Sequence, residues 1–87
     1  MTYDKEVHID HSRGVVFAWL RSDDRNVPPV RVEVSREFAA DNWHVQWKDE
    51  VKVTAAFESH KMDYLEPAAK AAGGSDLNFR VYKVYNR

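Results

Sequence analysis

The chain of 87 residues contains no cysteine. Disulfide bonds, thiolate nucleophiles and metal sites held by cysteine are therefore excluded, and packing alone has to stabilise the fold. Glycine and proline occur only three times each, and no glycine-rich phosphate-binding loop is present. The motifs of serine hydrolases and zinc peptidases are also missing. Nothing in the sequence therefore identifies an enzyme.

Neither sign of charge dominates. Thirteen Lys and Arg stand against fourteen Asp and Glu, which gives a net charge of -1. Such a balance provides no long-range attraction to nucleic acid or to an anionic membrane. The longest apolar run, residues 15–20, is far too short for a membrane span. We expect a cytoplasmic protein with no membrane association.

What is present suffices for one hydrophobic core. Hydrophobic residues make up 44% of the chain and aromatic residues 13%, which is too apolar for native disorder. A chain of this length fits one domain and not two. We therefore expect residues 1–87 to form a single compact domain.

Alternating polar and apolar residues predict several strands. Residues 3–11 alternate, as do 77–85 at the other end of the chain. Residues 15–20 are apolar on both faces, which favours a central strand covered on both sides. Because the prolines at 28–29 cannot donate to a ladder, the strand over 30–34 should begin after them and lie at a sheet edge or start beside a bulge.

Between residues 36 and 57, the spacing of the apolar residues fits both a strand and a helix. Alternation over 43–47 and 51–57 predicts a hairpin. The apolar residues Ala39, Ala40, Trp43, Trp47 and Val51 instead suit an amphipathic helix. We favour a short helical turn over 36–42 followed by strands, because the β-branched residues at 51–54 suit a helix interior poorly.

A further helix is predicted over residues 64–72. Asp63 and Glu66 have the spacing of a capping box, and the alanine-rich segment after them has high helix propensity. Together these elements predict an α+β fold: a mainly antiparallel β-sheet of about four to six strands with one or two short helices.

One local cluster carries metal-ligand residue types. His8, Asp10 and His11 lie close in sequence, and His60 with Asp63 could supply further ligands. On a strand, however, His11 points away from the other two. Solvated polar residues explain the cluster better, so a small enzyme or metal protein centred on it ranks second among the alternatives. We expect no cofactor and no metal.

Weak binding of single-stranded nucleic acid is the first alternative. The C-terminal segment interleaves cations with aromatics, and its candidate contacts are Arg80, Tyr82, Lys83 and Arg87. Such a sheet surface binds single strands in several domains. The small positive charge of this segment and the absence of an RNP-type motif count against it.

Trp43 and Trp47 lead to the favoured hypothesis. Exposed tryptophan, tyrosine and arginine dominate binding hot spots, although these indoles could instead form the core with Trp19 and Phe57. We therefore expect a small non-enzymatic protein-binding module, an accessory, adaptor or inhibitor protein of the kind that phages and mobile elements encode. Its predicted contact residues are Trp43, Trp47, Arg31, Arg36, Tyr64 and Tyr82.

An exposed edge strand could also pair with a second copy, so a homodimer is a further possibility. The two binding hypotheses separate by salt dependence. Phosphate contacts weaken steeply with salt, whereas a protein interface survives it and depends on the Trp43 side chain.

Overall fold

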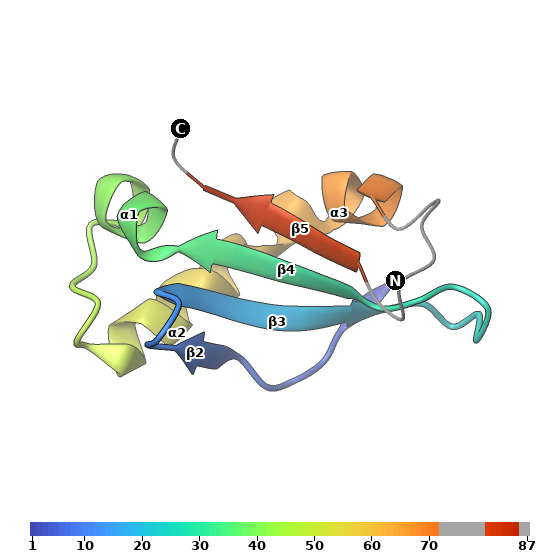
Figure 1. Cartoon of the computed structure of the whole chain (residues 1–87), viewed down its shortest axis with the longest axis horizontal. Helices are drawn as coiled ribbons and strands as arrows, with labels where there is room; N and C mark the ends of the chain where they lie inside the picture. Colours follow the sequence, from blue (N-terminus) through green and yellow to red (C-terminus); the bar gives the residue numbers. More distant parts are fainter. Residues whose placement is uncertain (72–79, 86–87) are drawn as a thin grey trace.

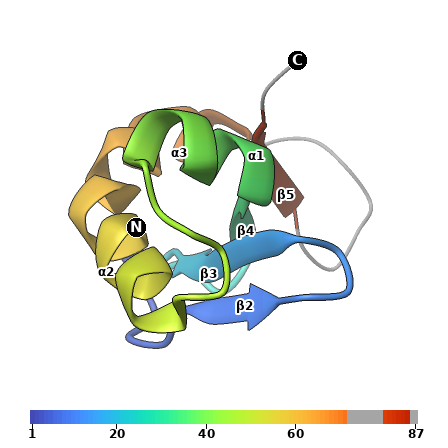
Figure 2. The same ribbon diagram turned by 90° about the vertical axis from the view of Figure 1, so that its left-hand side faces the viewer.

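The computed structural model describes residues 1–71 and 80–85, which form a five-stranded sheet with helices packed against one face (Figures 1 and 2). The strands are β1 (Thr2–Tyr3), β2 (His8–Asp10), β3 (Val15–Arg21), β4 (Val30–Ser35) and β5 (Arg80–Val84). The helical segments are α1 (Arg36–Phe38), the π-helical turn η1 (Ala39–Trp43), α2 (Glu50–His60), the 3-10 turn η2 (Lys61–Tyr64) and α3 (Leu65–Ala71). The predicted α+β class with a mainly antiparallel sheet is confirmed.

The sheet is built around β3 and β4. Strands β1 and β2 both pair antiparallel with β3, and β3 pairs antiparallel with β4. The chain then crosses the sheet through its helices and returns as β5, which runs parallel to β4 at the end of the sheet. A parallel neighbour requires such a long crossover, since a tight hairpin reverses the chain direction.

The core lies between the sheet and the helices. Alternate residues of β3 and β4 meet one side of α2 and α3, and the fully buried set is Val16, Ala18, Leu20, Val30, Val32, Val34, Val53, Phe57 and Ala68. Burial of each large apolar side chain in this layer contributes about 1.5–3 kcal/mol. The Phe57 ring meets Tyr3 and Trp43 edge-on, with centroids 6.4 and 6.3 Å apart.

The N-terminal segment forms β-structure, as predicted, but it is not one continuous strand. Residues 3–11 form two short strands instead of one, and both pair with β3. Asp10 ends β2 because its carboxylate accepts hydrogen bonds from the backbone amides of Ser12 and Arg13. Gly14 completes the turn at φ +64°, a left-handed conformation that glycine adopts without a Cβ penalty.

The central position of β3 is confirmed, but described helices cover only one of its faces. For β4, the predicted start of the strand is confirmed and the predicted edge position is wrong. The strand begins at Val30 directly after the two prolines, yet it lies between β3 and β5 and not at an edge. The prolines precede the first ladder position, so their missing N–H groups cost no sheet hydrogen bond.

Residues 36–43 are helical, as predicted, and Ser35 begins α1 by accepting a hydrogen bond of 3.1 Å from the Phe38 amide. The hairpin predicted over 43–47 and 51–57 is wrong. Residues 50–60 form α2, whose first turn is capped by the Asp49 carboxylate on the Lys52 amide. This cap and the burial of an i, i+4 pair outweigh the weak helix propensity of the β-branched residues.

The helix predicted over 64–72 is present as α3, but the capping box is wrong. Asp63 lies inside η2, so helical backbone precedes it, and its carboxylate contacts the His60 ring at 3.4 Å. The C-terminal strand is confirmed over the described part, β5, whereas residues 77–79 of the prediction lie outside the described residues. Among the described residues, no helix combines the length and apolarity needed to cross a bilayer.

Candidate functional site

The face of the sheet that points away from the helices is named here the open face. It is the side of β2–β5 turned toward the viewer in Figure 1, and none of the described helices covers it. The strand register places alternate residues there: His8 and Asp10 from β2, Phe17, Trp19 and Arg21 from β3, Arg31 and Glu33 from β4, and Val81 and Lys83 from β5. Arg13 and Tyr85 reach it from the ends of β3 and β5.

A series of ring and guanidinium contacts crosses this face. We name it the ladder, and the name refers to these side-chain contacts and not to the backbone hydrogen bonds between strands. The His8 ring stacks on Phe17, with centroids 5.1 Å apart and planes inclined by 23°. The Arg31 guanidinium carbon lies 5.2 Å from the Phe17 centroid and 5.7 Å from that of Trp19. Arg21 lies 5.9 Å from the same Trp19 ring. Phe17 and Trp19 also meet edge-on with centroids 6.4 Å apart, so each ring has at least three planar or cationic neighbours within the chain.

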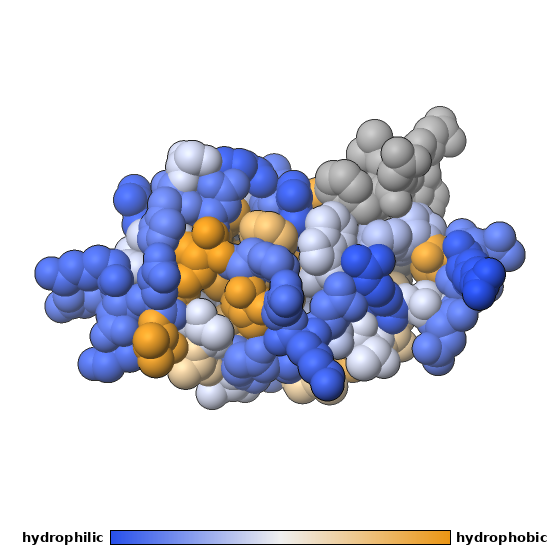
Figure 3. All heavy atoms as spheres, turned by 90° about the horizontal axis from the view of Figure 1, so that it is seen from below, coloured by the Kyte–Doolittle hydropathy of each residue, from blue (hydrophilic) through white to orange (hydrophobic). Residues whose placement is uncertain are grey.

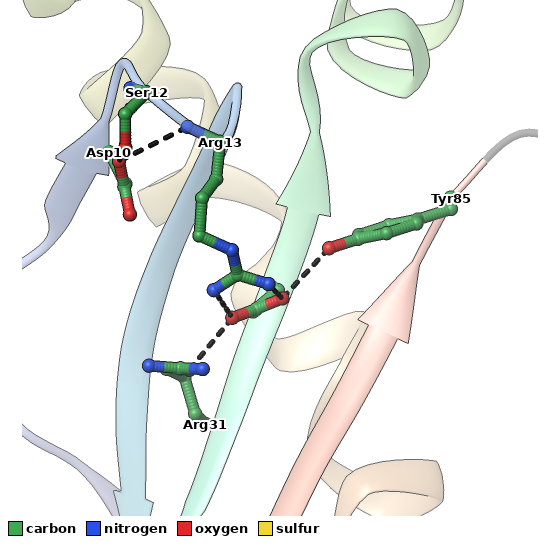
Figure 4. Close-up of polar contacts among 6 residues, drawn as sticks. Asp10, Ser12, Arg13, Arg31 and Tyr85 are labelled. Carbon is green, nitrogen blue, oxygen red and sulfur yellow. Dashed lines mark hydrogen bonds and ion pairs between the residues drawn. The ribbon is translucent and has the colours of Figure 1, made fainter.

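Beside the ladder lies a buried carboxylate, drawn in Figure 4. The Glu33 side chain is fully buried, although the strand register places it on the face without helices; Figure 4 labels its partners Arg13, Arg31 and Tyr85. Arg13 donates to both of its oxygens at 3.0 and 3.4 Å, Arg31 Nε lies 2.7 Å away, and the Tyr85 hydroxyl donates at 2.8 Å. We name these four residues the Glu33 cluster. Desolvation of Glu33 would be costly without the hydrogen bonds from Arg13 and Tyr85 and the ion pair with Arg31.

The contacts of the Glu33 cluster shift the pKa values of Arg13 and Tyr85. Hydrogen bonding to Glu33, followed by its charge, raises the pKa of the Arg13 guanidinium above its ordinary value. Burial and then the bond to Glu33 raise the pKa of Tyr85 to about 12. Next to the cluster, the hydrogen bond from the Ser12 hydroxyl lowers the pKa of the Asp10 carboxyl. The hydroxyl of Tyr85 thus stays protonated, and the Asp10 carboxylate stays charged, across the physiological range.

A groove of about 670 Å³ lies at the end of the molecule where α1 begins. It is lined by Arg36, Glu37, Ala40, Asp41, Val45, Gln46, Trp47 and Lys48. The His11 ring contacts Trp47 edge-on at 6.3 Å and also bonds Glu50, so the loop before α2 is tied to the turn before β3. Seen from below, several hydrophobic residues are visible among hydrophilic ones (Figure 3).

The residues predicted to bind a protein partner do not form one surface. Arg31 lies on the open face, whereas Trp47 and Arg36 line the groove. The other three, Trp43, Tyr64 and Tyr82, pack against the core from the helix side. Trp43 is half-buried and stacks on His60 at 5.4 Å with nearly parallel planes.

The predicted nucleic-acid residues are also divided. Tyr82 and Lys83 are consecutive in β5, so Tyr82 faces the core and Lys83 the open face. The side chain of Arg80 and all of Arg87 lie outside the described residues. Tyr82 and Lys83, the two residues of that prediction whose side chains are described, therefore do not share a surface.

The histidines of the metal hypothesis lie in separate places. His8 belongs to the ladder, His11 bonds Glu50, and His60 stacks on Trp43. Within residues 1–71 and 80–85, no three histidine or carboxylate side chains are grouped in a way that could hold a metal ion. Asp10, the third residue of that hypothesis, caps its own turn.

Sequence analysis missed four residues of the open face: Arg13, Phe17, Trp19 and Glu33. A signal existed, because a hairpin between residues 15–21 and 30–35 brings Phe17 and Trp19 opposite Glu33 and Arg31. The sequence alone names Trp19 only as a possible core residue, because its segment is apolar on both faces. The alternation of β4 was read correctly, but a buried carboxylate on its outer side was not expected.

Comparison of the chain with protein-family models, with curated proteins and with solved structures found no match. Any function must therefore be argued from the residues of this chain.

Proposed function

We propose that this chain is a small non-enzymatic protein-binding module, acting in the cytoplasm as an accessory, adaptor or inhibitor protein. Its contact surface in this proposal is the open face, and not the Trp43 region favoured by the sequence. The observation that carries the proposal is the ladder, in which Arg31 contacts both Phe17 and Trp19.

The ladder suits a protein interface for an energetic reason. Binding normally costs the rotamer freedom of each long side chain that becomes ordered, about 0.5–1.5 kcal/mol. Here Arg31 is held by two rings and by Glu33, and its side chain is only 21% exposed. Arg, Trp and Tyr are also the residue types most enriched in binding hot spots. Binding of a partner would therefore cost little further side-chain entropy, because the fold already orders this surface.

Single-stranded nucleic acid is the second candidate, because Phe17 and Trp19 share the open face with Arg13, Arg21, Arg31 and Lys83. Base stacking needs an accessible ring face, however. The Phe17 ring is occupied by His8 and Arg31, and the Trp19 ring by Arg21 and Arg31. A base would compete with these neighbours for the ring faces, so we rank this candidate lower. A homodimer through an exposed edge strand stays a prediction.

The test is affinity capture from a nuclease-treated native extract, with bound proteins identified by mass spectrometry. The wild-type chain is compared with the variants Trp19→Ala and Arg31→Ala. The matched controls are Val51→Ala and Lys52→Ala, which change exposed residues of α2 on the opposite side of the sheet. We expect the same protein to be enriched by the wild type and both controls, and lost with both open-face variants. Circular dichroism of every variant verifies folding.

Three results would overturn the proposal. The first is that no protein is enriched over blank resin. In the second, Trp19→Ala and Arg31→Ala are both folded and capture the partner as well as the wild type does. The third is binding that requires intact nucleic acid and collapses with salt, which would favour the second candidate.

A further inference from the structure

On the open face, the side chains of Arg13 and Lys83 lie nearer to the solvent than the carboxylate of Glu33. The carboxylate of Glu33 is completely buried, whereas Arg13, which pairs with it, has a side chain that is 44% exposed. Lys83 is opposite Glu33 in the sheet register and exposed, and its ammonium lies 5.6 Å from the Tyr85 ring centroid. An approaching molecule therefore meets Arg13 and Lys83 at the surface, while the Glu33 carboxylate beneath them is covered.

The other carboxylates near this face are already engaged. The Asp10 carboxylate accepts from the Ser12 hydroxyl at 2.6 Å and from two backbone amides of its own turn. Asp4 accepts from Arg21 Nε at 2.9 and 3.0 Å. Neither carboxylate forms a bond with Lys83 among the contacts of the described residues. Asp10 keeps its negative charge beside Arg13, so among the described residues at the β3–β5 end of the face the three cations Arg13, Arg31 and Lys83 outnumber the carboxylates Glu33 and Asp10 by one.

Arg13 is suited to bind a second anion. A guanidinium carries five N–H donors in a fixed plane, and Glu33 accepts from two nitrogens of Arg13. The Glu33 bonds fix the orientation of that plane, so the outer donors are pre-organised. Lys83 supplies a second positive charge from the neighbouring side of Glu33.

We infer that the partner of the open face presents an acidic protein segment, whose carboxylates bind Arg13 and Lys83 above the buried Glu33. This inference rests on the proposed function. A carboxylate is favoured over the phosphates of a nucleic acid because the rings beside the site are occupied by Arg31. The net charge of -1 also provides no general attraction to a polyanion.

The inference is tested with defined probes by fluorescence anisotropy. The probes are a labelled peptide of about ten residues that alternates Glu and Val, its analogue with Gln for Glu, and an oligothymidylate of about the same length. Titrations at about 50 mM and about 300 mM salt measure the electrostatic share of binding. We expect the Glu peptide to bind wild type at least about fivefold more tightly than the Gln analogue at low salt.

Two charge-matched variants locate the binding. Arg13→Gln with Lys83→Gln removes two positive charges from the open face, and Lys52→Gln with Lys70→Gln removes two from the helical side. Lys52 and Lys70 have side chains that are 74% and 77% exposed. The preference for the Glu peptide should disappear in the first variant and persist in the second. Lys83→Glu alone, which leaves the bonds to Glu33 in place, serves if Arg13→Gln prevents folding.

Equal affinity for the Glu and Gln peptides overturns the inference, as does an equal loss in both double variants, which would mean unspecific charge attraction. Tighter binding of the oligothymidylate overturns it in favour of phosphate. If partner capture depends on Trp19 and Arg31 but the Glu peptide shows no preference, only this inference fails. If capture does not depend on the open face, the proposed function itself fails.

Discussion

Arg31 Nε lies 2.7 Å from Glu33 Oε2, and the two residues are neighbours on one face of the same strand, β4. The same guanidinium group lies over the rings of Phe17 and Trp19. Arg31 therefore belongs to both the ladder and the Glu33 cluster, so a substitution of Arg31 removes contacts from both. This connection determines which substitutions should be informative.

Replacement of Glu33 by Gln should destabilise the fold by about 1–3 kcal/mol, because the arginines lose a charged acceptor while the site stays buried. Urea unfolding of the variant and the wild type measures the difference. Glu37→Gln is the control, since its side chain is 63% exposed and such a surface change should stay within about 0.5 kcal/mol. Equal stability of Glu33→Gln and wild type would show that the buried charge contributes nothing to folding.

Tyr85 should make the protein less stable in alkaline solution. Its pKa is raised from 10.0 to about 12 by burial and by the bond to Glu33. Below pH of about 10 the residue is protonated in both states; between about 10 and about 12 the unfolded chain loses the proton first, so stability falls as pH rises. Tyr3 and Tyr64 also have raised pKa values, chiefly through burial, and contribute in the same direction.

The variant Tyr85→Phe isolates the contribution of Tyr85 to this pH dependence of stability. The variant should lose about 0.5–1.5 kcal/mol at neutral pH, because Glu33 loses one donor. Its stability should then fall less steeply than that of the wild type above pH of about 10. Urea unfolding over this range, with absorbance titration of tyrosinate, makes the comparison, and parallel pH profiles would contradict the assignment.

The parts of the fold with one dominant pattern were predictable. Residues 30–35 alternate cleanly, and the helical turn after Ser35 begins at a good N-cap residue. The alternation and β-branching of residues 51–57 resemble a strand, and Asp49 falls between the two segments of the predicted hairpin. Its position before Glu50, with basic residues near the other end of the segment, is the signature of a helix that the alternation obscured.

The candidate site was less predictable, because it depends on which strands are neighbours. Arg13 and Glu33 are twenty residues apart in sequence and meet only after β3 and β4 have paired. Trp19 could be placed on either face by its own segment, since both faces are apolar. Periodicity assigns a residue to a face, but it does not show whether a helix layer covers that face.

The N-cap of α2 can be tested directly. Asp49 Oδ1 accepts from the Lys52 amide at 3.2 Å, so Asp49→Ala should destabilise the protein by about 0.5–2 kcal/mol. Asp49→Ser, which keeps an acceptor at the cap, should recover most of the loss in thermal unfolding. If Ser and Ala behave alike, the carboxylate does not cap the helix.

Val51 and Val53 distinguish a helix from a strand at this segment. They would share one face of a strand, yet in α2 Val53 is fully buried and Val51 is 80% exposed. Val53→Ala should therefore cost about 2 kcal/mol through lost burial and a cavity. Val51→Ala should be neutral or stabilise by up to about 0.5 kcal/mol, because alanine has the higher helix propensity. Equal losses, measured by urea unfolding, would restore the strand interpretation.

Arg31→Lys tests whether the planar guanidinium, and not its charge alone, organises the open face. Lysine keeps the positive charge near Glu33 but cannot stack its ammonium flat on a ring while also binding a carboxylate. We expect a folded variant that loses about 0.5–1.5 kcal/mol of stability. The ring protons of Phe17 and Trp19 should shift in NMR spectra, whereas those of Trp43, which packs on the helix side, should not. If the charge alone mattered, the Phe17 and Trp19 signals would stay in place and partner capture would be unchanged, which would remove the ladder as the basis of binding.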